Sequence, residues 1–100
     1  MIIRPFILWI VLVSYTYADE YQIKEQRVNG KYDLPFAAVI VKQNNAVVFN
    51  GRTDKLGRIS ISLPTGPYRA EIQDFDKVWR SVNITVDGTS TIKVVDVPVQ

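Results

Sequence analysis

The sequence predicts an all-β protein, a seven-stranded antiparallel β-sandwich preceded by an N-terminal hydrophobic segment. Short runs of alternating apolar and polar residues predict strands with one buried face. Turn-forming Gly, Pro, Asn and Asp residues separate these runs about every 8–12 residues, which is typical of a β-sandwich. No stretch after the hydrophobic segment has the period of an amphipathic helix. The 100 residues are enough for a single domain of this kind.

The first 18 residues, MIIRPFILWIVLVSYTYA, have the pattern of a secretory signal peptide. A positive charge is followed by an apolar run and by small residues at the −3 and −1 positions of a cleavage site; these are Arg4, Phe6–Val13, Thr16 and Ala18. A short membrane anchor helix that is never cut is the alternative, although this apolar run is shorter than the ~20 residues of a usual span.

We therefore divide the chain into a signal peptide or short anchor, residues 1–18, and a β-sandwich domain, residues 19–100. With either fate of the first segment, the domain is expected to be secreted or to lie on the extracytoplasmic or lumenal side of a membrane, anchored through residues 1–18 if these are retained. Small secreted domains often depend on disulfides, and this chain has no cysteine. We expect a densely packed core or partner contacts to compensate.

Three strands are expected in the first half of the domain. Asp19–Val28 is polar with few apolar residues, which predicts a weak strand at a sheet edge. A turn at Asn29-Gly30 and a loop follow it. Phe36–Lys42 is apolar and β-branched, which favours a strand buried on both faces. The next strand begins at Ala46, and Asn50-Gly51 is expected to bend or bulge it.

Four more strands are expected in the second half, at Arg58–Leu63, Tyr68–Gln73, Val78–Val86 and Thr89–Val99. The alternation in each indicates which side chains face the core. The inward sets are Ile59, Ile61 and Leu63; Tyr68, Ala70 and Ile72; and Val78, Val82, Ile84 and Val86. The pattern of the last strand shifts, which predicts a bulge near Val94 or Val95.

The stretch TDKLGRISISLPTGPYRAEIQ carries a more specific signal. It resembles the signature of the carboxypeptidase regulatory-like domains, which are transthyretin-like (prealbumin-like) sandwiches. The matching turn positions are Thr53, Asp54, Gly57, Pro64, Gly66 and Tyr68. The upstream segment PFAAVIV is similar to another part of the family pattern, except that Ala37 stands where the family often has glycine. The resemblance covers roughly residues 21–99 and implies a non-catalytic module of a secreted enzyme, surface protein or membrane complex. It also implies kinship of fold with carbohydrate-binding sandwiches.

The residues themselves argue against an enzyme. The chain has neither cysteine nor histidine, which removes thiolate chemistry and the commonest general base. Asp74 and Asp76 form a carboxylate pair but lack the other ligands of a calcium loop. No catalytic residue, metal or cofactor is therefore expected. The net charge is only +2 with scattered basic residues, so no nucleic-acid partner is expected either.

Four residues are candidate contact or modification sites. Trp79 lies on the face opposite the apolar residues of its strand, where an exposed ring could stack on a sugar or anchor a protein partner. Phe75 lies in the preceding turn and is the second candidate, with Tyr32 a further aromatic for a sugar site. Asn83-Ile84-Thr85 is a sequon, so Asn83 is a candidate N-glycosylation site.

Three functions follow from these observations. The first is a non-catalytic interaction or structural module, an accessory subunit or surface component with a protein partner, in a membrane complex for instance. The second is a carbohydrate-binding module that uses Trp79. The third is a polymer subunit in which a strand of one copy completes the sheet of the next. It depends on the weak first strand and on Thr89–Val99. The sequence leaves the oligomeric state open.

Overall fold

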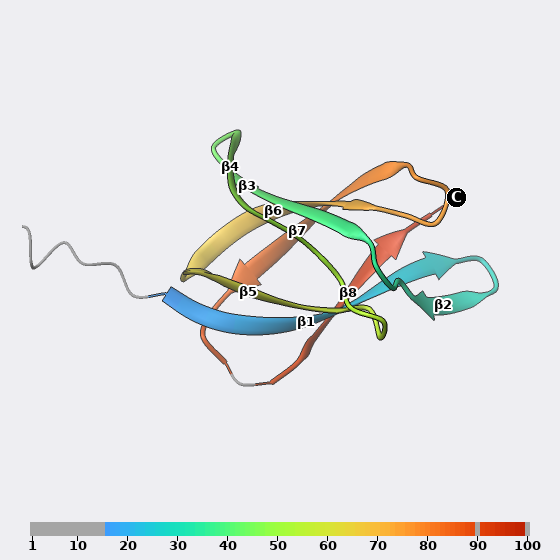
Figure 1. Cartoon of the computed structure of the whole chain (residues 1–100), viewed down its shortest axis with the longest axis horizontal. Helices are drawn as coiled ribbons and strands as arrows, with labels where there is room; N and C mark the ends of the chain where they lie inside the picture. The colour runs from blue at the N-terminus through green and yellow to red at the C-terminus, as the bar shows by residue number, and fades with distance from the viewer. Residues whose placement is uncertain (1–15, 90, 100) are drawn as a thin grey trace, which may run out of the picture.

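Over the residues that the structure describes, the protein is an all-β sandwich of eight strands in two sheets (Figure 1). The computed structural model describes residues 16–89 and 91–99, with side chains from residue 18 onward. The strands, in chain order, are β1 (Thr16–Arg27), β2 (Gly30–Asp33), β3 (Ala38–Gln43), β4 (Ala46–Arg52), β5 (Arg58–Pro64), β6 (Gly66–Gln73), β7 (Trp79–Val86) and β8 (Lys93–Pro98). Within these residues no helix is long and apolar enough to cross a membrane.

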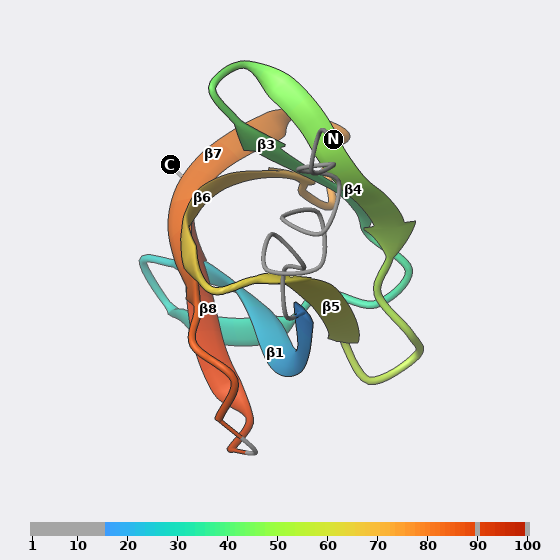
Figure 2. The same ribbon diagram turned by 90° about the vertical axis from the view of Figure 1, so that its left-hand side faces the viewer.

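The two sheets lie face to face (Figure 2). Sheet A contains β2, β1, β5 and β8, and sheet B has the order β4-β3-β6-β7. All pairings are antiparallel except that of β8 with β1, which is parallel. At the sides of the sandwich β4 lies next to β5, and β7 next to β8.

Strand β1 is the central strand of sheet A, so the prediction of a weak edge strand is wrong. It pairs with β5 along Thr16–Gln22, with β2 along Lys24–Arg27 and with β8 along Tyr21–Gln26. Its inward face carries Asp19 and Glu25, both fully buried. Buried carboxylates are tolerated only when they are paired and hydrogen-bonded, and both are, as described below.

The described part of the chain has eight strands and not seven, because β2 forms where a turn and a loop were predicted. Two smaller predictions are also wrong. The last strand keeps a continuous register with β1, from Tyr21↔Lys93 to Gln26↔Pro98, without the predicted bulge. The irregularity expected within β4 occurs at its pairing with Val41 and Lys42, and not at Asn50-Gly51.

The predicted signal or anchor helix falls largely outside the described residues. The structure describes the chain from residue 16, and Thr16–Ala18 already belong to β1, where they pair with Ser62–Pro64 of β5. The strand therefore crosses the expected boundary between residues 18 and 19.

The core lies between the sheets and confirms most of the predicted alternation. The inward residues of β5 (Ile59, Ile61, Leu63) and of β6 (Tyr68, Ala70, Ile72) are buried, as are Ile84 and Val86 of β7. Val78 is an exception, with 45% of its surface exposed. It lies in the turn before β7 and not within the strand. Strand β3 is buried on one face only, at Val39 and Val41.

Gly57 gives a stability test of the most crowded turn. Its φ is 80°, and a Cβ there would lie 3.0 Å from the backbone nitrogen of Leu34 and 3.1 Å from the carbonyl oxygen of Ile23. We expect Gly57→Ala to lower the free energy of unfolding by about 2–4 kcal/mol, from conformational strain and overpacking together. Gly88 has a similar φ of 76° but is exposed. Gly88→Ala is the control and should cost about 1 kcal/mol. Equal losses in urea denaturation would contradict the crowding argument.

Candidate functional site

A strained turn between β2 and β3 presents Phe36 to solvent. Its φ is 54°, which is a genuine outlier for a bulky side chain, and its side chain is 61% exposed. Pro35 followed by a residue with positive φ is the arrangement of a type II turn, in which glycine is usual at the second position. The buried Thr53 hydroxyl closes the turn: it donates to the Leu34 carbonyl and accepts from the Ala37 N–H, both at 2.7 Å.

The turn between β4 and β5 is built around Asp54. Its Oδ1 accepts hydrogen bonds from the N–H groups of Leu56 (2.8 Å) and Arg58 (2.9 Å). These bonds, chiefly the one from Arg58, hold the pKa of the Asp54 carboxyl below its usual value. The Gly57 N–H donates to the Asp54 carbonyl at 3.0 Å, and the positive φ of Gly57 completes the turn.

The turn between β6 and β7 repeats this geometry with a lysine in place of the glycine. Asp74 Oδ1 accepts from the N–H groups of Asp76 (2.8 Å) and Val78 (2.9 Å). The Lys77 N–H donates to the Asp74 carbonyl at 3.0 Å. Lys77 therefore occupies the position that Gly57 has in the other turn, and its φ is 66°. A side chain with a Cβ is held where glycine is favoured.

Buried charges fix this second turn to the sandwich. Burial raises the pKa of Asp74, but the hydrogen bonds from the Val78 N–H and the Arg80 guanidinium outweigh it, and the net pKa is lowered. Arg80 Nε lies 2.9 Å from Asp74 Oδ2. The buried Glu25 of β1 binds Arg27 and accepts from the Phe75 N–H at 3.1 Å. The turn that carries Phe75 and Lys77 is thus held from both sheets.

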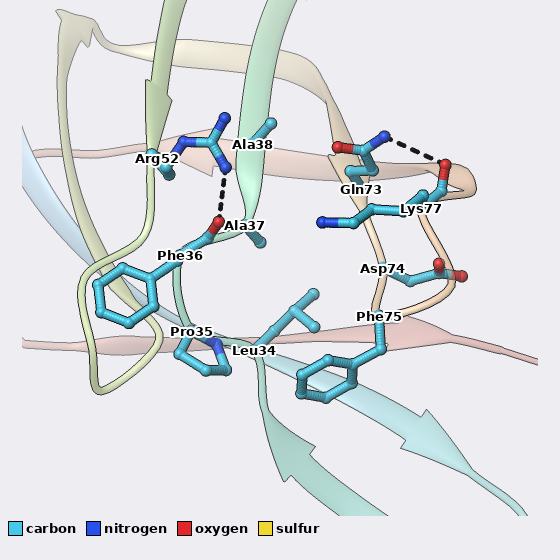
Figure 3. Close-up of a pocket in the computed structure, with 10 residues that line it drawn as sticks. All are labelled: Leu34, Pro35, Phe36, Ala37, Ala38, Arg52, Gln73, Asp74, Phe75 and Lys77. Atoms are coloured by element: carbon cyan, nitrogen blue, oxygen red, sulfur yellow. Dashed lines mark hydrogen bonds between the residues drawn. The ribbon is translucent and has the colours of Figure 1, made fainter.

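The two strained residues line one hollow. Figure 3 shows the Pro35–Phe36 turn on one side, the Asp74–Lys77 turn on the other, and Arg52 above. The hollow has a volume of about 60 Å³. Arg52 Nη1 donates to the Phe36 carbonyl at 2.7 Å, and the Lys77 ammonium points into the space between the two turns (Figure 3).

Trp79 lies beside this hollow, on the outer face of sheet B. The register pairs Arg52 with Ala38 and Gln73 with Trp79 at the same end of sheet B, next to the Val39–Ile72 pair that joins β3 to β6. A second, open hollow of about 390 Å³ is lined by Trp79, Ile40, Asn50 and the shared residues Ala38 and Arg52. We call Phe36, Phe75 and Trp79 the aromatic end; their exposed fractions are 61%, 53% and 45%.

The structure brings some of the predicted site residues together and separates others. Phe75 and Trp79 both belong to the aromatic end, whereas Tyr32 lies on β2 in the other sheet. Asn83 is exposed on the same face of β7 as Trp79 and pairs with Arg69.

The residues of the predicted motif turns lie in two separate places. Thr53, Asp54 and Gly57 adjoin the aromatic end, whereas Pro64, Gly66 and Tyr68 form the β5–β6 corner, where the Tyr68 hydroxyl donates to the Pro64 carbonyl at 2.6 Å. Among the described residues, no three Asp or Glu side chains are grouped so that they could hold a metal ion.

Sequence reasoning missed Phe36, Arg52 and Lys77. A sequence signal exists only for Lys77: Asp74-Phe75-Asp76-Lys77 repeats the spacing of Asp54-Lys55-Leu56-Gly57 with lysine for glycine. This signal does not concern hydrophobicity, so alternation patterns do not detect it.

A second charge cluster joins β1 to the loop between β7 and β8. The buried Asp19 carboxylate accepts from the N–H groups of Asp87 and Gly88, both at 2.9 Å, and binds the Lys93 ammonium. Lys93 also binds Asp87 and lies 5.5 Å from the centre of the Tyr21 ring. Burial raises the pKa of Tyr21 to about 12. The Lys93 ammonium, with the Thr89 N–H, lowers the pKa of Asp87 to about 2. All four side chains are engaged within the domain, so the cluster is structural.

The lowered pKa of Asp87 predicts that the folded protein loses part of its stability in acid. Its pKa is lower in the folded state, so its contribution to stability is complete above about pH 4 and is lost as the pH falls towards about 2. Asp87→Asn should therefore lower the urea midpoint at pH 6, and the difference from the wild type should shrink to a small part of that value near pH 2. Circular dichroism at both pH values measures this. A difference that stays constant down to pH 2 would exclude the carboxylate as its cause.

Lys77 gives an unusual stability prediction. Lys77→Gly should raise the free energy of unfolding by about 0.5–1 kcal/mol, because glycine adopts a φ of 66° without strain. Lys55 lies in the matching turn but is not among the residues with positive φ. Lys55→Gly is the control and should lower stability by about 0.5–1 kcal/mol through the entropy of the unfolded chain. A lower urea midpoint for Lys77→Gly would show that the lysine stabilises the fold.

A scan against protein-family models and a search of curated proteins found no match for this chain.

Proposed function

We propose that this chain is a non-catalytic β-sandwich module that binds a protein partner outside the cytoplasm, as an accessory subunit or surface component. The observation that carries the proposal is the aromatic end: Phe36, Phe75 and Trp79 are all exposed and line two hollows that share Ala38 and Arg52. Clustered exposed aromatic residues mark interaction sites, and aromatic and arginine side chains dominate interface energetics.

The rigidity of the site supports the same function. Thr53 fixes the turn of Phe36, and Glu25 and Asp74 fix the turn of Phe75. Contact residues held in place lose little conformational entropy on binding, which favours affinity. The place outside the cytoplasm is part of the proposal and rests on the signal-like residues 1–18.

We also propose kinship with the carboxypeptidase regulatory-like domains. It is supported by the roles of the motif residues: the Thr53 hydroxyl closes one turn, the Asp54 carboxylate caps another, and Gly57 has a positive φ. The eight-stranded sandwich of two sheets is compatible with a transthyretin-like arrangement.

Carbohydrate binding is the second candidate, and one observation favours it. Trp79 faces the open hollow on sheet B beside Asn50 and Arg52, so a sugar ring could stack on the indole next to polar side chains. Asn83, a proposed glycosylation site, lies on the same face. The strand-exchange function has no support in the described residues, because β1 and β8 pair with each other within one chain.

The test is a pull-down with the tagged full chain from native membranes and medium, with intact mass measured on the recovered chain. We expect a stoichiometric protein partner that is lost with Phe75→Ala and with Trp79→Ala. The control is Val94→Ala, an apolar side chain 58% exposed on β8 of the other sheet. Retention of the partner by both aromatic variants would overturn the proposal. Loss only with Trp79→Ala, together with glycan-array binding, would favour the carbohydrate function.

A further inference from the structure

We propose that the hollow between the Pro35–Phe36 turn and the Asp74–Lys77 turn binds a carboxylate, namely an aspartate or glutamate side chain of a partner protein segment with apolar neighbours. Lys77 and Arg52 are the two cationic ligands. This inference rests on the proposed function and names the chemistry of the partner at the aromatic end.

The two cations are free to receive an anion. Among residues 16–89 and 91–99, neither Lys77 nor Arg52 forms an ion pair. Arg52 uses Nη1 on the Phe36 carbonyl, at 2.7 Å, and a guanidinium carries five N–H donors. The Lys77 ammonium points into the hollow from the opposite turn (Figure 3). A planar carboxylate between them would gain charge-assisted hydrogen bonds from both.

The acids around the hollow do not neutralise these cations. The Asp74 carboxylate is fully buried and accepts from two backbone N–H groups and from Arg80. Asp76 lies 3.2 Å from Arg27. Each nearby acid thus has its own partner, and the open space of the hollow lies between two positive charges.

The size of the hollow indicates the end of a side chain as its occupant. Its volume is about 60 Å³, compared with roughly 300–1,000 Å³ for pockets that enclose a small-molecule ligand. Leu34, Pro35, Phe36 and Phe75 supply an apolar margin. A carboxylate on a short aliphatic stem fits such a space, and its apolar neighbours in sequence can contact the two exposed phenylalanine rings.

The backbone of Lys77 points to the same conclusion. Asp74 builds the same turn as Asp54, and glycine fills the strained position in the latter. A lysine there gives up stability, and backbone strain of this kind is concentrated at functional sites. The part of Lys77 that glycine cannot supply is the ammonium group in the hollow.

An anionic membrane is a less suitable occupant. Lipid-binding surfaces gather clusters of about 4–8 basic residues, whereas Arg27 and Arg80 near the hollow are already paired with acids. Only Lys77 and Arg52 among the lining residues present a positive charge. Two convergent cations suit a single carboxylate better than a charged surface.

The test is titration of the full ¹⁵N-labelled chain with acetyl-Phe-Glu-Phe-amide and, as the matched probe, acetyl-Phe-Gln-Phe-amide. We expect the glutamate peptide to shift the amide signals of Ala37, Ala38 and Lys77. The affinity of the glutamine peptide should be lower by about tenfold or more. Absence of shifts with the glutamate peptide, or equal binding of both peptides, would overturn the inference.

Variants locate the effect. Lys77→Gly and Lys77→Gln should each weaken the glutamate peptide about tenfold, and the first is expected to be more stable than the wild type, so unfolding cannot explain a loss. Lys55→Gln is the control and should bind as the wild type does. Equal weakening by Lys55→Gln would show diffuse charge attraction and overturn the site. Binding to phosphatidylserine vesicles that depends on Lys77, without peptide binding, would assign the hollow to a membrane instead.

The pull-down separates this inference from the function it rests on. A partner lost with Phe75→Ala and also with Lys77→Gly supports both. A partner lost with Phe75→Ala but kept by Lys77→Gly supports the interaction function and overturns the inference that the hollow binds a carboxylate. A partner kept by both aromatic variants overturns the proposed function itself, while the peptide titration still tests the hollow.

Discussion

The rest of the site depends on the two hydrogen bonds of the Thr53 hydroxyl group. It is buried and joins the Leu34 carbonyl to the Ala37 N–H, both at 2.7 Å. A buried backbone group without a partner costs about 1–3 kcal/mol, so this one hydroxyl makes the turn between them stable. This turn then fixes the backbone conformation of Phe36. An exposed ring is therefore positioned by a contact between segments that are distant in the sequence, and its orientation requires the whole sandwich to be folded.

The strand faces could be predicted from the sequence because they depend on local alternation, and the role of β1 could not. Asp19, Tyr21, Ile23 and Glu25 all point inward, which is a regular period of two that includes two acids. A polarity pattern assigns acids to the surface. Glu25 has one nearby partner, Arg27, but the burial of the two acids also depends on Lys93 and on the N–H of Phe75, groups that lie 74 and 50 residues away in the sequence. Partners at that distance leave no local signal, so a central strand was mistaken for an edge.

The candidate site was predictable to the extent that it depends on strand parity. The exposure of Trp79 follows from the alternation of β7, and that of Phe75 from its place in a turn. Phe36 and Lys77 stand out as site residues because of their positive φ. A pattern of apolar and polar residues does not predict φ. Their proximity is also a property of the fold, because the two turns meet only when β3 pairs with β6. The sequence pattern can therefore identify an exposed aromatic residue, but the assembly of a hollow requires the register of the sheet.

The residues that line this hollow include two, Phe36 and Lys77, that have both a strained backbone and an exposed side chain. Among the residues that the structure describes, four other than glycine have positive φ. Asn44 and Asn45 form a tight hairpin turn in which asparagine is favoured, which leaves Phe36 and Lys77. The backbone strain at each is about 1–2 kcal/mol before the entropy of the unfolded chain is counted, a sizeable fraction of the 5–15 kcal/mol that stabilises a typical domain. Both side chains are exposed and add little to the core. The folded chain gains little from either side chain, and this supports the proposed partner contact at the hollow that they share.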